Sequence, residues 1–534
     1  MKFRFLFASF LAGALSMSAQ GYKDGVEYFK VDQFDDAKTL LERNLNDPST
    51  DKAAAYYYLG AIDLFQKNLS GAKANFDKGI QADPKNGLNY VGLGKLALMQ
   101  GNDASAEDYF KQAISMNKKN AKVINAITRA YYTVDRVKYA KQIDKYMAQA
   151  LKANKQEPEI FVLQGDMKTD EKQWGDAGAL YENAILYDQG NPEAYVKYAR
   201  TYFNVNPEYA INKLKELLQL KPESALAQRE LAEKYYENDQ LTRAAEQYGK
   251  YIQNPNHFKK DEQRYVGLLY FGKKYDESYA LAQKLLNEDP NNFFMQRMLF
   301  LNKAAMKDYK GAAEQAEKFF ANGKGEYVAN DYSTYGSVLQ ELRNDSLAVI
   351  QFEKAVEVNP DKAELLKDLS SAYNKAKNYQ KSAEAYQQFV DKGDYVTNDL
   401  YVLAGRYMTL AATSPVGSDQ KKNAVDNAIK YIDIVLEKVP DDYRILQRKA
   451  RILVTKNDNE PALEVVETYK GVVDMLDKDP QNKTTHADAY KEAYNNIGNY
   501  YLSQKDNATA KVYFEKFLEI DPGNEALREF LSKL

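Results

Sequence analysis

Residues 53–86 read AAAYYYLGAIDLFQKNLSGAKANFDKGIQADPKN, and the pattern returns in the next 34 residues, 87–120, as GLNYVGLGKLALMQGNDASAEDYFKQAISMNKKN. A third clear copy occupies residues 491–524, far downstream. The copies share a Leu-Gly or Ile-Gly pair, then an alanine, then a phenylalanine, as in Leu59-Gly60, Ala72 and Phe76. Self-similarity at a period of this length predicts a solenoid of stacked helical hairpins.

The residue types within each copy indicate helices that pack closely. Apolar residues recur every three or four positions, in two stretches separated by a polar turn such as Gly101-Asn102-Asp103. A small residue stands at the eighth position and another at the twentieth, while a large residue follows at the twenty-fourth. Small and large residues at facing positions let helices interlock at interior density. Proline, as in Asp83-Pro84, ends the second helix because it disfavours helical geometry in the preceding residue.

In these residues the chain resembles the tetratricopeptide repeat family, in the form of its exported members from Bacteroidota. The resemblance implies an all-α, right-handed superhelical solenoid of about fourteen helical hairpins, which a C-terminal helix at 525–534 caps. It also implies that partner peptides lie in a concave groove lined by the first helix of each repeat, at positions 2, 5, 9, 12 and 13.

The repeats divide the chain into an N-terminal solenoid at 21–322 and a C-terminal solenoid at 329–534. The glycine-rich segment 323–328 between them is either a hinge or a surface turn between two ordinary repeats. The spacing lengthens between Gly405 and Ala428, which predicts an insertion at 411–423 with a loop at 413–418. The second helix of the repeat at 443–490 is expected to run on through Leu476.

Residues 1–20 have the pattern of a cleaved export signal. Lys2 and Arg4 precede a short apolar run and a small-residue stretch, and the apolar run is too short for a membrane anchor. The chain has no cysteine, so it has no disulfide framework and no acceptor for a lipid. We therefore expect an exported protein of the Gram-negative periplasm, not membrane-spanning, which could lie peripherally on the inner or outer membrane.

The sequence gives no sign of catalysis. The two histidines, His257 and His486, lie far apart in sequence and without cysteine make a poor metal site, and no cofactor or metal is expected. Gly92-Leu93-Gly94-Lys95 lacks the spacing and the hydroxyl residue of a phosphate-binding loop. A net charge of −3 offers no basic field for nucleic acid. We expect neither an enzyme nor a nucleic-acid-binding protein.

Candidate partner-binding residues follow from the groove positions of the family. Near the N-terminus these positions are mostly apolar, which favours burying a peptide. Basic residues recur at the ninth position, where they either grip partner carboxylates or form a solvated face. The candidate set is Tyr57, Leu64, Phe65, Val91, Lys95, Leu98, Met99, Arg129, Tyr132, Arg200, Arg406 and Arg451.

These features favour a non-catalytic scaffold that binds proteins of envelope assembly, secretion or transport. The alternative is an accessory protein for envelope glycan binding or uptake, whose inner-face tyrosines stack on sugar rings; the candidates are Tyr57, Tyr132, Tyr236 and Tyr270. Self-association through terminal repeats into a homo-oligomer is a further expectation.

Overall fold

The computed structural model describes residues 21–116, 118–321, 323 and 325–534. The described residues form helices joined by short turns, without a strand. They fall into two compact units, one up to Met298 and one from Leu299 onward. The predicted export signal, residues 1–20, lies outside the described residues.

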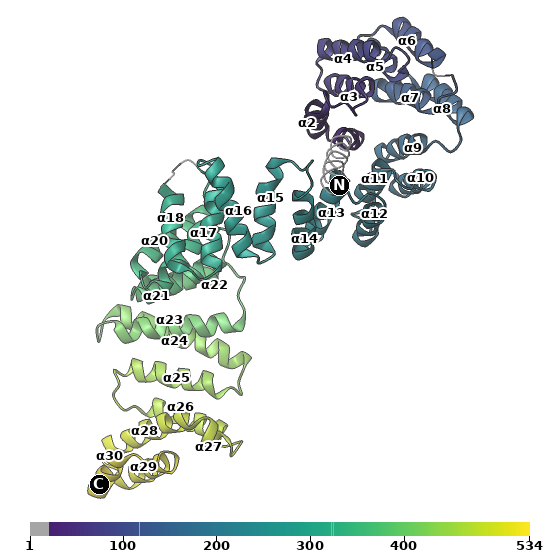
Figure 1. Cartoon of the computed structure of the whole chain (residues 1–534). Coiled ribbons are helices and arrows are strands. Elements are labelled where there is room, and N and C mark those ends of the chain that lie inside the picture. Colours follow the sequence, from purple (N-terminus) through teal and green to yellow (C-terminus); the bar gives the residue numbers. More distant parts are fainter. Residues whose placement is uncertain (1–20, 117, 322, 324) are drawn as a thin grey trace, which may run out of the picture. The chain divides into compact units, whose positions relative to one another are not determined.

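In the first unit, helical residues 21–30 pair with the next helix, and the following helices pair in the same way (Figure 1). The helices are α2 (Phe34–Asn44), α3 (Lys52–Phe65), α4 (Leu69–Ala82), α5 (Gly87–Met99), α6 (Asp103–Met116), α7 (Ala121–Asp135), α8 (Ala140–Ala153), α9 (Pro158–Asp170), α10 (Trp174–Tyr187), α11 (Pro192–Tyr202), α12 (Pro207–Leu220), α13 (Ala225–Glu237), α14 (Leu241–Ile252), α15 (Lys259–Phe271) and α16 (Tyr275–Glu288).

The boundary between the units falls within α17 (Phe293–Ala305). The second unit continues with α18 (Tyr309–Ala321), α19 (Ala329–Glu341), α20 (Asp345–Val358), α21 (Glu364–Lys375), α22 (Tyr379–Asp391), α23 (Thr397–Thr413), α24 (Asp419–Lys438), α25 (Tyr443–Lys456), α26 (Leu463–Leu476), α27 (Asn482–Thr485), α28 (Ala487–Ser503), α29 (Asn507–Ile520) and α30 (Glu525–Lys533). Over the described residues this is the expected all-α solenoid of fourteen hairpins, and α30 is the expected capping helix.

Successive first helices contact one another, for example α3 with α5, α5 with α7, and α23 with α25. They form one face of each unit, which we call its inner face. Polar side chains begin many of the helices: the Asn68 and Asn86 side chains accept hydrogen bonds from backbone N–H groups of α4 and α5. These caps satisfy donors that the first helical turn leaves unpaired.

Each eighth-position glycine faces the large residue of its own hairpin, as the repeat pattern predicts. A Cβ atom added to Gly60 would lie 2.5 Å from the Phe76 ring, and one added to Gly94 would lie 2.3 Å from the Phe110 ring. The same relation joins Gly498 to Phe514. Because real Cβ atoms do not approach this closely, these positions require glycine for the two helices to meet.

Gly94→Ala should therefore destabilise the protein by about 1–3 kcal/mol, the usual cost of overpacking a filled core. The Phe110 ring is fully buried in a cluster of apolar side chains, so an added methyl group must displace packed neighbours. Gly175→Ala is the matched control, since nothing lies within 4 Å of its added Cβ. The control should be neutral or stabilising by up to about 1 kcal/mol through helix propensity. Urea denaturation measures both changes, and equal effects of the two substitutions would contradict the packing argument.

The predicted insertion at 411–423 is accommodated mainly by longer helices. Helix α23 runs to Thr413 and α24 begins at Asp419, so the turn is confined to Ser414–Ser418. Helix α26 ends at Leu476, where the sequence predicted its end. In the segment predicted as a hinge or turn, the Tyr327 hydroxyl donates to the Phe319 carbonyl oxygen over 3.1 Å. This contact ties the segment to α18 and favours a turn, while the hinge stays a prediction.

Candidate partner-binding surfaces

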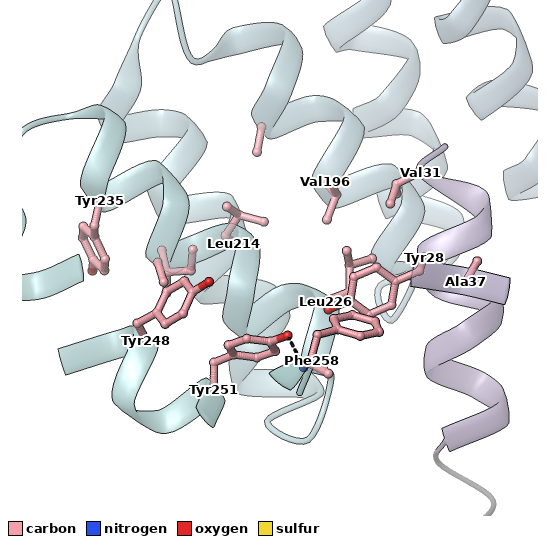
Figure 2. Close-up of a cluster of buried hydrophobic side chains, with 14 of the residues drawn as sticks. Tyr28, Val31, Ala37, Val196, Leu214, Leu226, Tyr235, Tyr248, Tyr251 and Phe258 are labelled. Atoms are coloured by element: carbon pink, nitrogen blue, oxygen red, sulfur yellow. Dashed lines mark hydrogen bonds between the residues drawn. The ribbon is translucent and has the colours of Figure 1, made fainter. Parts of the chain in front are cut away.

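In the first unit, the N-terminal hairpin, residues 21–44, lies against the inner face of hairpins far along the chain. Tyr28 and Val31 are almost fully buried in a cluster with residues of α11, α13 and α14 (Figure 2). The Tyr28 ring meets the Phe258 ring edge-on, with centroids 5.2 Å apart. Burying large apolar side chains drives this contact, at about 1.5–3 kcal/mol per fully buried side chain.

Polar contacts lie along the same interface between the N-terminal hairpin and α11 to α14, and they fix how the hairpin docks. Arg200 donates to the Val31 carbonyl oxygen over 2.8 Å, and the Ser224 hydroxyl donates to Glu27 over 2.6 Å. Arg229 pairs with Asp36 over 2.9 Å. Such bonds are directional, so they set the orientation of a contact whose apolar part is not directional.

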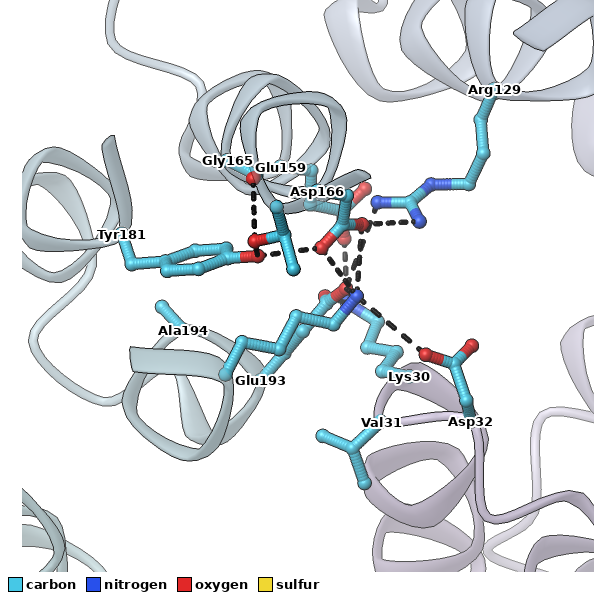
Figure 3. Close-up of polar contacts among 12 residues, drawn as sticks. Lys30, Val31, Asp32, Arg129, Glu159, Gly165, Asp166, Tyr181, Glu193 and Ala194 are labelled. Carbon is cyan, nitrogen blue, oxygen red and sulfur yellow. Dashed lines mark hydrogen bonds and ion pairs between the residues drawn. The ribbon is translucent and has the colours of Figure 1, made fainter. Parts of the chain in front are cut away.

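A cluster of charged side chains lies next to the N-terminal hairpin, at the edge of this interface (Figure 3). The Asp166 carboxylate lies 2.8 Å from both the Lys197 ammonium and the Arg129 guanidinium. Lys30 of the N-terminal hairpin pairs with Glu159 over 2.7 Å and approaches Glu193 at 3.7 Å. Burial alone would raise the pKa of Asp166, but Lys197 and Arg129 outweigh it and hold that pKa below its usual value. The cluster is therefore charged and balanced within the chain.

The structure corrects the predicted apolar groove of the first unit. Leu64, Val91 and Leu98 are each no more than 3% exposed, because they pack between helices in the hairpin cores. The expectation that these three lie open on the inner face is wrong. Phe65 and Met99 are exposed, although the Phe65 ring also packs on Phe34 with centroids 4.3 Å apart.

The polar candidates of the first unit are largely engaged by partners within the chain. Arg129 pairs with Asp166, and Arg200 pairs with Glu230. The Tyr132 hydroxyl donates to Asp170 over 2.6 Å. These contacts indicate that acidic residues of the chain itself neutralise the basic side chains of this face, so the face does not present a row of unpaired cations to a partner.

Tyr57 and Lys95 are both half-buried in the first unit. Tyr57 packs against the rings of Tyr58 and Phe76, and burial raises its pKa to about 12. Burial and the nearby Arg129 charge lower the pKa of Lys95 to about 8. The other two tyrosines predicted to stack on sugar rings also have neighbours within the chain. The Arg264 guanidinium lies over the Tyr236 ring. The Tyr270 ring contacts the rings of Phe271 and Tyr275.

The inner face of the second unit carries two adjoining hollows. One has a volume of about 420 Å³ and lies between α21, α23 and α25, with Tyr401, Arg406 and Arg448 in its lining. The other has a volume of about 370 Å³ and lies between α23, α25 and α28, with Arg451 and Glu492 in its lining. Met408 and Thr409 line both hollows. We call this surface the second-unit groove.

The two candidate arginines in the second-unit groove differ in their surroundings. Arg451 forms two short charge-assisted bonds with Glu492, at 2.7 and 2.6 Å. Arg406 has no carboxylate partner among the described residues, and its buried Nε atom has no hydrogen-bond partner there. Burial lowers the pKa of Arg406, a sign that an uncompensated charge is held away from water.

Sequence reasoning missed Arg448, which stands at the sixth position of its repeat and outside the family's groove positions. Its guanidinium crosses Gly405: a Cβ added there would lie 2.3 Å from an Arg448 terminal nitrogen. It also lies over the Tyr401 ring, 4.0 Å from the centroid. Its buried Nε atom, like that of Arg406, has no hydrogen-bond partner among the described residues. Glycine at Gly405, next to Arg406, was the available signal that a long side chain crosses there.

Two absences concern the part of the chain that the structure describes. No group of three or more His, Asp or Glu side chains there is placed to hold a metal ion. No helix there is both long and apolar enough to cross a membrane.

Comparison with family models matches three segments of the chain to the tetratricopeptide repeat. Residues 89–120 and 491–524 match one such model, and residues 336–396 match another. No curated protein matches the chain significantly.

Solved structures similar to this chain include other proteins of the same repeat. The C-terminal part of a repeat protein from Cytophaga hutchinsonii is 18% identical, with 50% of this chain and 98% of that chain covered and a TM-score of 0.39. A tetratricopeptide repeat protein from Parabacteroides merdae is 17% identical, with 54% and 98% covered and a TM-score of 0.27. The Cut9–Hcn1 hetero-tetramer of APC/C is 12% identical, with 84% and 98% covered and a TM-score of 0.32.

Proposed function

Because the chain is a tetratricopeptide repeat protein, we propose that it is a non-catalytic scaffold that binds partner proteins along the second-unit groove. Tetratricopeptide repeats generally mediate protein–protein interaction. The observation that carries the proposal is the contrast between the two inner faces. The N-terminal hairpin covers part of the first, whereas the second has two adjoining hollows with half-buried arginine, tyrosine and methionine side chains.

The chemistry of the second-unit groove supports a protein ligand. Tyr401 and Met408 offer apolar contact area, while Arg406 offers hydrogen-bond donors. Grooves of this mixed kind suit extended or helical peptides, because apolar contacts give affinity and a few polar groups fix the orientation.

The proposal includes a cellular location, the periplasm. The export pattern in residues 1–20 supports a periplasmic scaffold for envelope assembly, secretion or transport proteins. Recovery of a chain without residues 1–20 in the periplasmic fraction would support export, and recovery of the full chain in the cytoplasm would contradict it. Self-association is a separate proposal, which light scattering of the mature protein tests.

Filling the second-unit groove should remove the partners. Thr409→Tyr places a large ring where both hollows meet, and affinity purification from the envelope fraction should then recover at least tenfold less of each partner. Thr468→Tyr is the matched control: Thr468 is also half-buried and bonds the carbonyl four residues before it, but it lies on α26, outside both hollows. Equal recovery from both variants, or no partner with the unmodified chain, would contradict the proposal.

A further inference from the structure

A polar cavity of about 270 Å³ lies in the first unit, where the N-terminal hairpin meets the beginnings of α9 and α11. Three acidic side chains of its lining are each more than nine-tenths buried: Glu27, Glu157 and Glu193. Buried ionised groups cost free energy unless a partner compensates them, so a cavity that they line is a candidate ligand site.

Glu157 is the acid of this lining that the chain leaves without a full partner. The neighbouring cluster of charged side chains (Figure 3) is neutralised without it, since three cations there already face at least as many acids. The Oε2 atom of Glu157 accepts a long bond from Asn154, at 3.4 Å, whereas its Oε1 atom is buried with no hydrogen-bond partner among the described residues. Burial raises the pKa of Glu157 by more than the charge of the exposed Lys122 lowers it.

Glu27, in the N-terminal hairpin, is a second acid of the lining whose charge is incompletely compensated. The Ser224 hydroxyl donates to Glu27 over 2.6 Å, while the Lys221 ammonium lies 3.5 Å away. Burial nevertheless raises the pKa of Glu27, so these two partners do not offset the loss of water. Lys23, also in the lining, is exposed, and water therefore screens its charge.

The rest of the lining suits an aliphatic chain. Val26, Pro158 and Pro192 supply apolar wall, and Tyr22 supplies an aromatic ring. A water molecule takes up about 30 Å³ in the liquid, so the cavity has room for a short unbranched molecule. No group of three or more His, Asp or Glu side chains within the described ranges is placed to hold one metal ion, which favours a ligand whose positive charges lie apart.

We propose that this cavity binds a linear aliphatic diamine or polyamine, with one ammonium group on Glu157 and another on Glu27. An ammonium group donates three hydrogen bonds, so it can supply the missing partner of the Glu157 Oε1 atom while the methylene chain lies on the apolar wall. Such a ligand joins the N-terminal hairpin to α9 and holds the first unit closed. The site lies outside the second-unit groove and does not depend on the scaffold function.

Calorimetry on the full mature chain tests the site, with putrescine as the probe. Butylamine, which has one ammonium group, and butanediol, which has none, are its matched counterparts. Putrescine should bind at least tenfold more tightly than butylamine, since a hydrogen bond to a charged group contributes about that factor or more. Butanediol should not bind.

Glu157→Gln keeps the size of the side chain and removes its charge. It should weaken putrescine binding by about tenfold or more, yet keep or raise the melting temperature of the unliganded chain, because the buried charge that it removes lacks a full partner. Glu246→Gln makes the same charge change at an exposed position of α14, outside the cavity, and should leave binding unchanged. Saturating putrescine should slow hydrogen exchange in residues 21–44 of the unmodified chain, because a ligand that binds only the folded state stabilises it.

Four results would overturn the site. These are no binding of putrescine to the unmodified chain, equal affinity for putrescine and butylamine, equal binding by Glu157→Gln and Glu246→Gln, or a lower melting temperature of unliganded Glu157→Gln, which would mark Glu157 as structural. Tighter binding of a lysine-containing peptide than of putrescine would assign the cavity to a protein side chain instead. The scaffold function stands or fails separately, on partner recovery with Thr409→Tyr.

Discussion

Tyr28→Ala should lower the free energy of unfolding of the first unit by about 3–5 kcal/mol, the usual cost of deleting a large, fully buried aromatic side chain. The Tyr28 side chain is completely buried, and it joins the N-terminal hairpin to the ring of Phe258, some 230 residues away. The loss of this ring removes apolar contact area and leaves a cavity. The cavity lies between two hairpins that are not neighbours in the repeat order, so ordinary stacking of adjacent repeats does not hold them together.

Hydrogen exchange shows where this destabilisation acts. Amides of α11 to α14 should lose protection in Tyr28→Ala, because the N-terminal hairpin covers these helices, whereas amides of α23 to α26 should keep theirs. Tyr28→Phe retains the ring and should stay within about 1 kcal/mol of the unmodified chain, since it removes at most one hydrogen-bonding group. Unchanged protection of α11 to α14 in Tyr28→Ala would show that the hairpin does not dock as described.

Asp166→Asn should destabilise the first unit by about 2–3 kcal/mol. Breaking a buried ion pair from one side typically costs about 3–5 kcal/mol, because the remaining charge stays buried and unpaired. Here the Asp166 side chain is 18% exposed, so water screens part of the cost. The substitution leaves both Arg129 and Lys197 without their shared carboxylate. Asp77→Asn, which breaks the exposed pair with Lys73, should change stability by no more than about 0.5 kcal/mol.

The effect of Asp166 should depend on pH in one direction. Its pKa in the folded chain is lowered, so the ionised form contributes stability above the pKa of an unfolded aspartate, about 3.9. That contribution is lost as the pH falls through the lower folded pKa. Urea denaturation at neutral pH should show the full difference between the unmodified chain and Asp166→Asn, and the difference should shrink below about pH 4. A difference that grows toward acid would contradict the charge cluster.

The repeat pattern predicted the hairpins because its signals are local. Gly94 and Phe110 lie sixteen positions apart in one hairpin, so a small and a large residue at fixed spacing were enough to place two helices in contact. Proline and polar turns marked the helix ends in the same way. The spacing predicted extra residues near 411, but the sequence did not show that α23 and α24 are long helices there.

The docking of the N-terminal hairpin could not be read from spacing. The contacts of Lys30 with Glu159 and of Asp24 with Asn256 span 129 and 232 residues, and they depend on the small rotation that each repeat adds to the last. The same limit explains the error at Leu64 and Leu98. Position within a repeat selects a helix face, but whether that face is open depends on how closely neighbouring hairpins stack.

The candidate arginines were found by position, but their roles depend on their neighbours. Arg451 and Arg406 both stand at the ninth position of a repeat. Glu492 neutralises Arg451, whereas Arg406 shares its hollow with a second arginine, Arg448. Which side chains pair across repeats depends on how neighbouring hairpins stack. A single sequence gives the residue types, but it does not show which residues of two hairpins lie opposite each other.

Site-specific photo-crosslinking in the native cell tests the central claim most directly. A benzophenone amino acid at position 409 lies where the two hollows of the second-unit groove meet, and the same group at position 350 lies on α20 at an exposed isoleucine outside them. We predict discrete crosslinked partner proteins from position 409 and none of those partners from position 350. The same crosslinks from both positions, or none from 409 while 350 gives them, would contradict a scaffold that binds its partners along the second-unit groove.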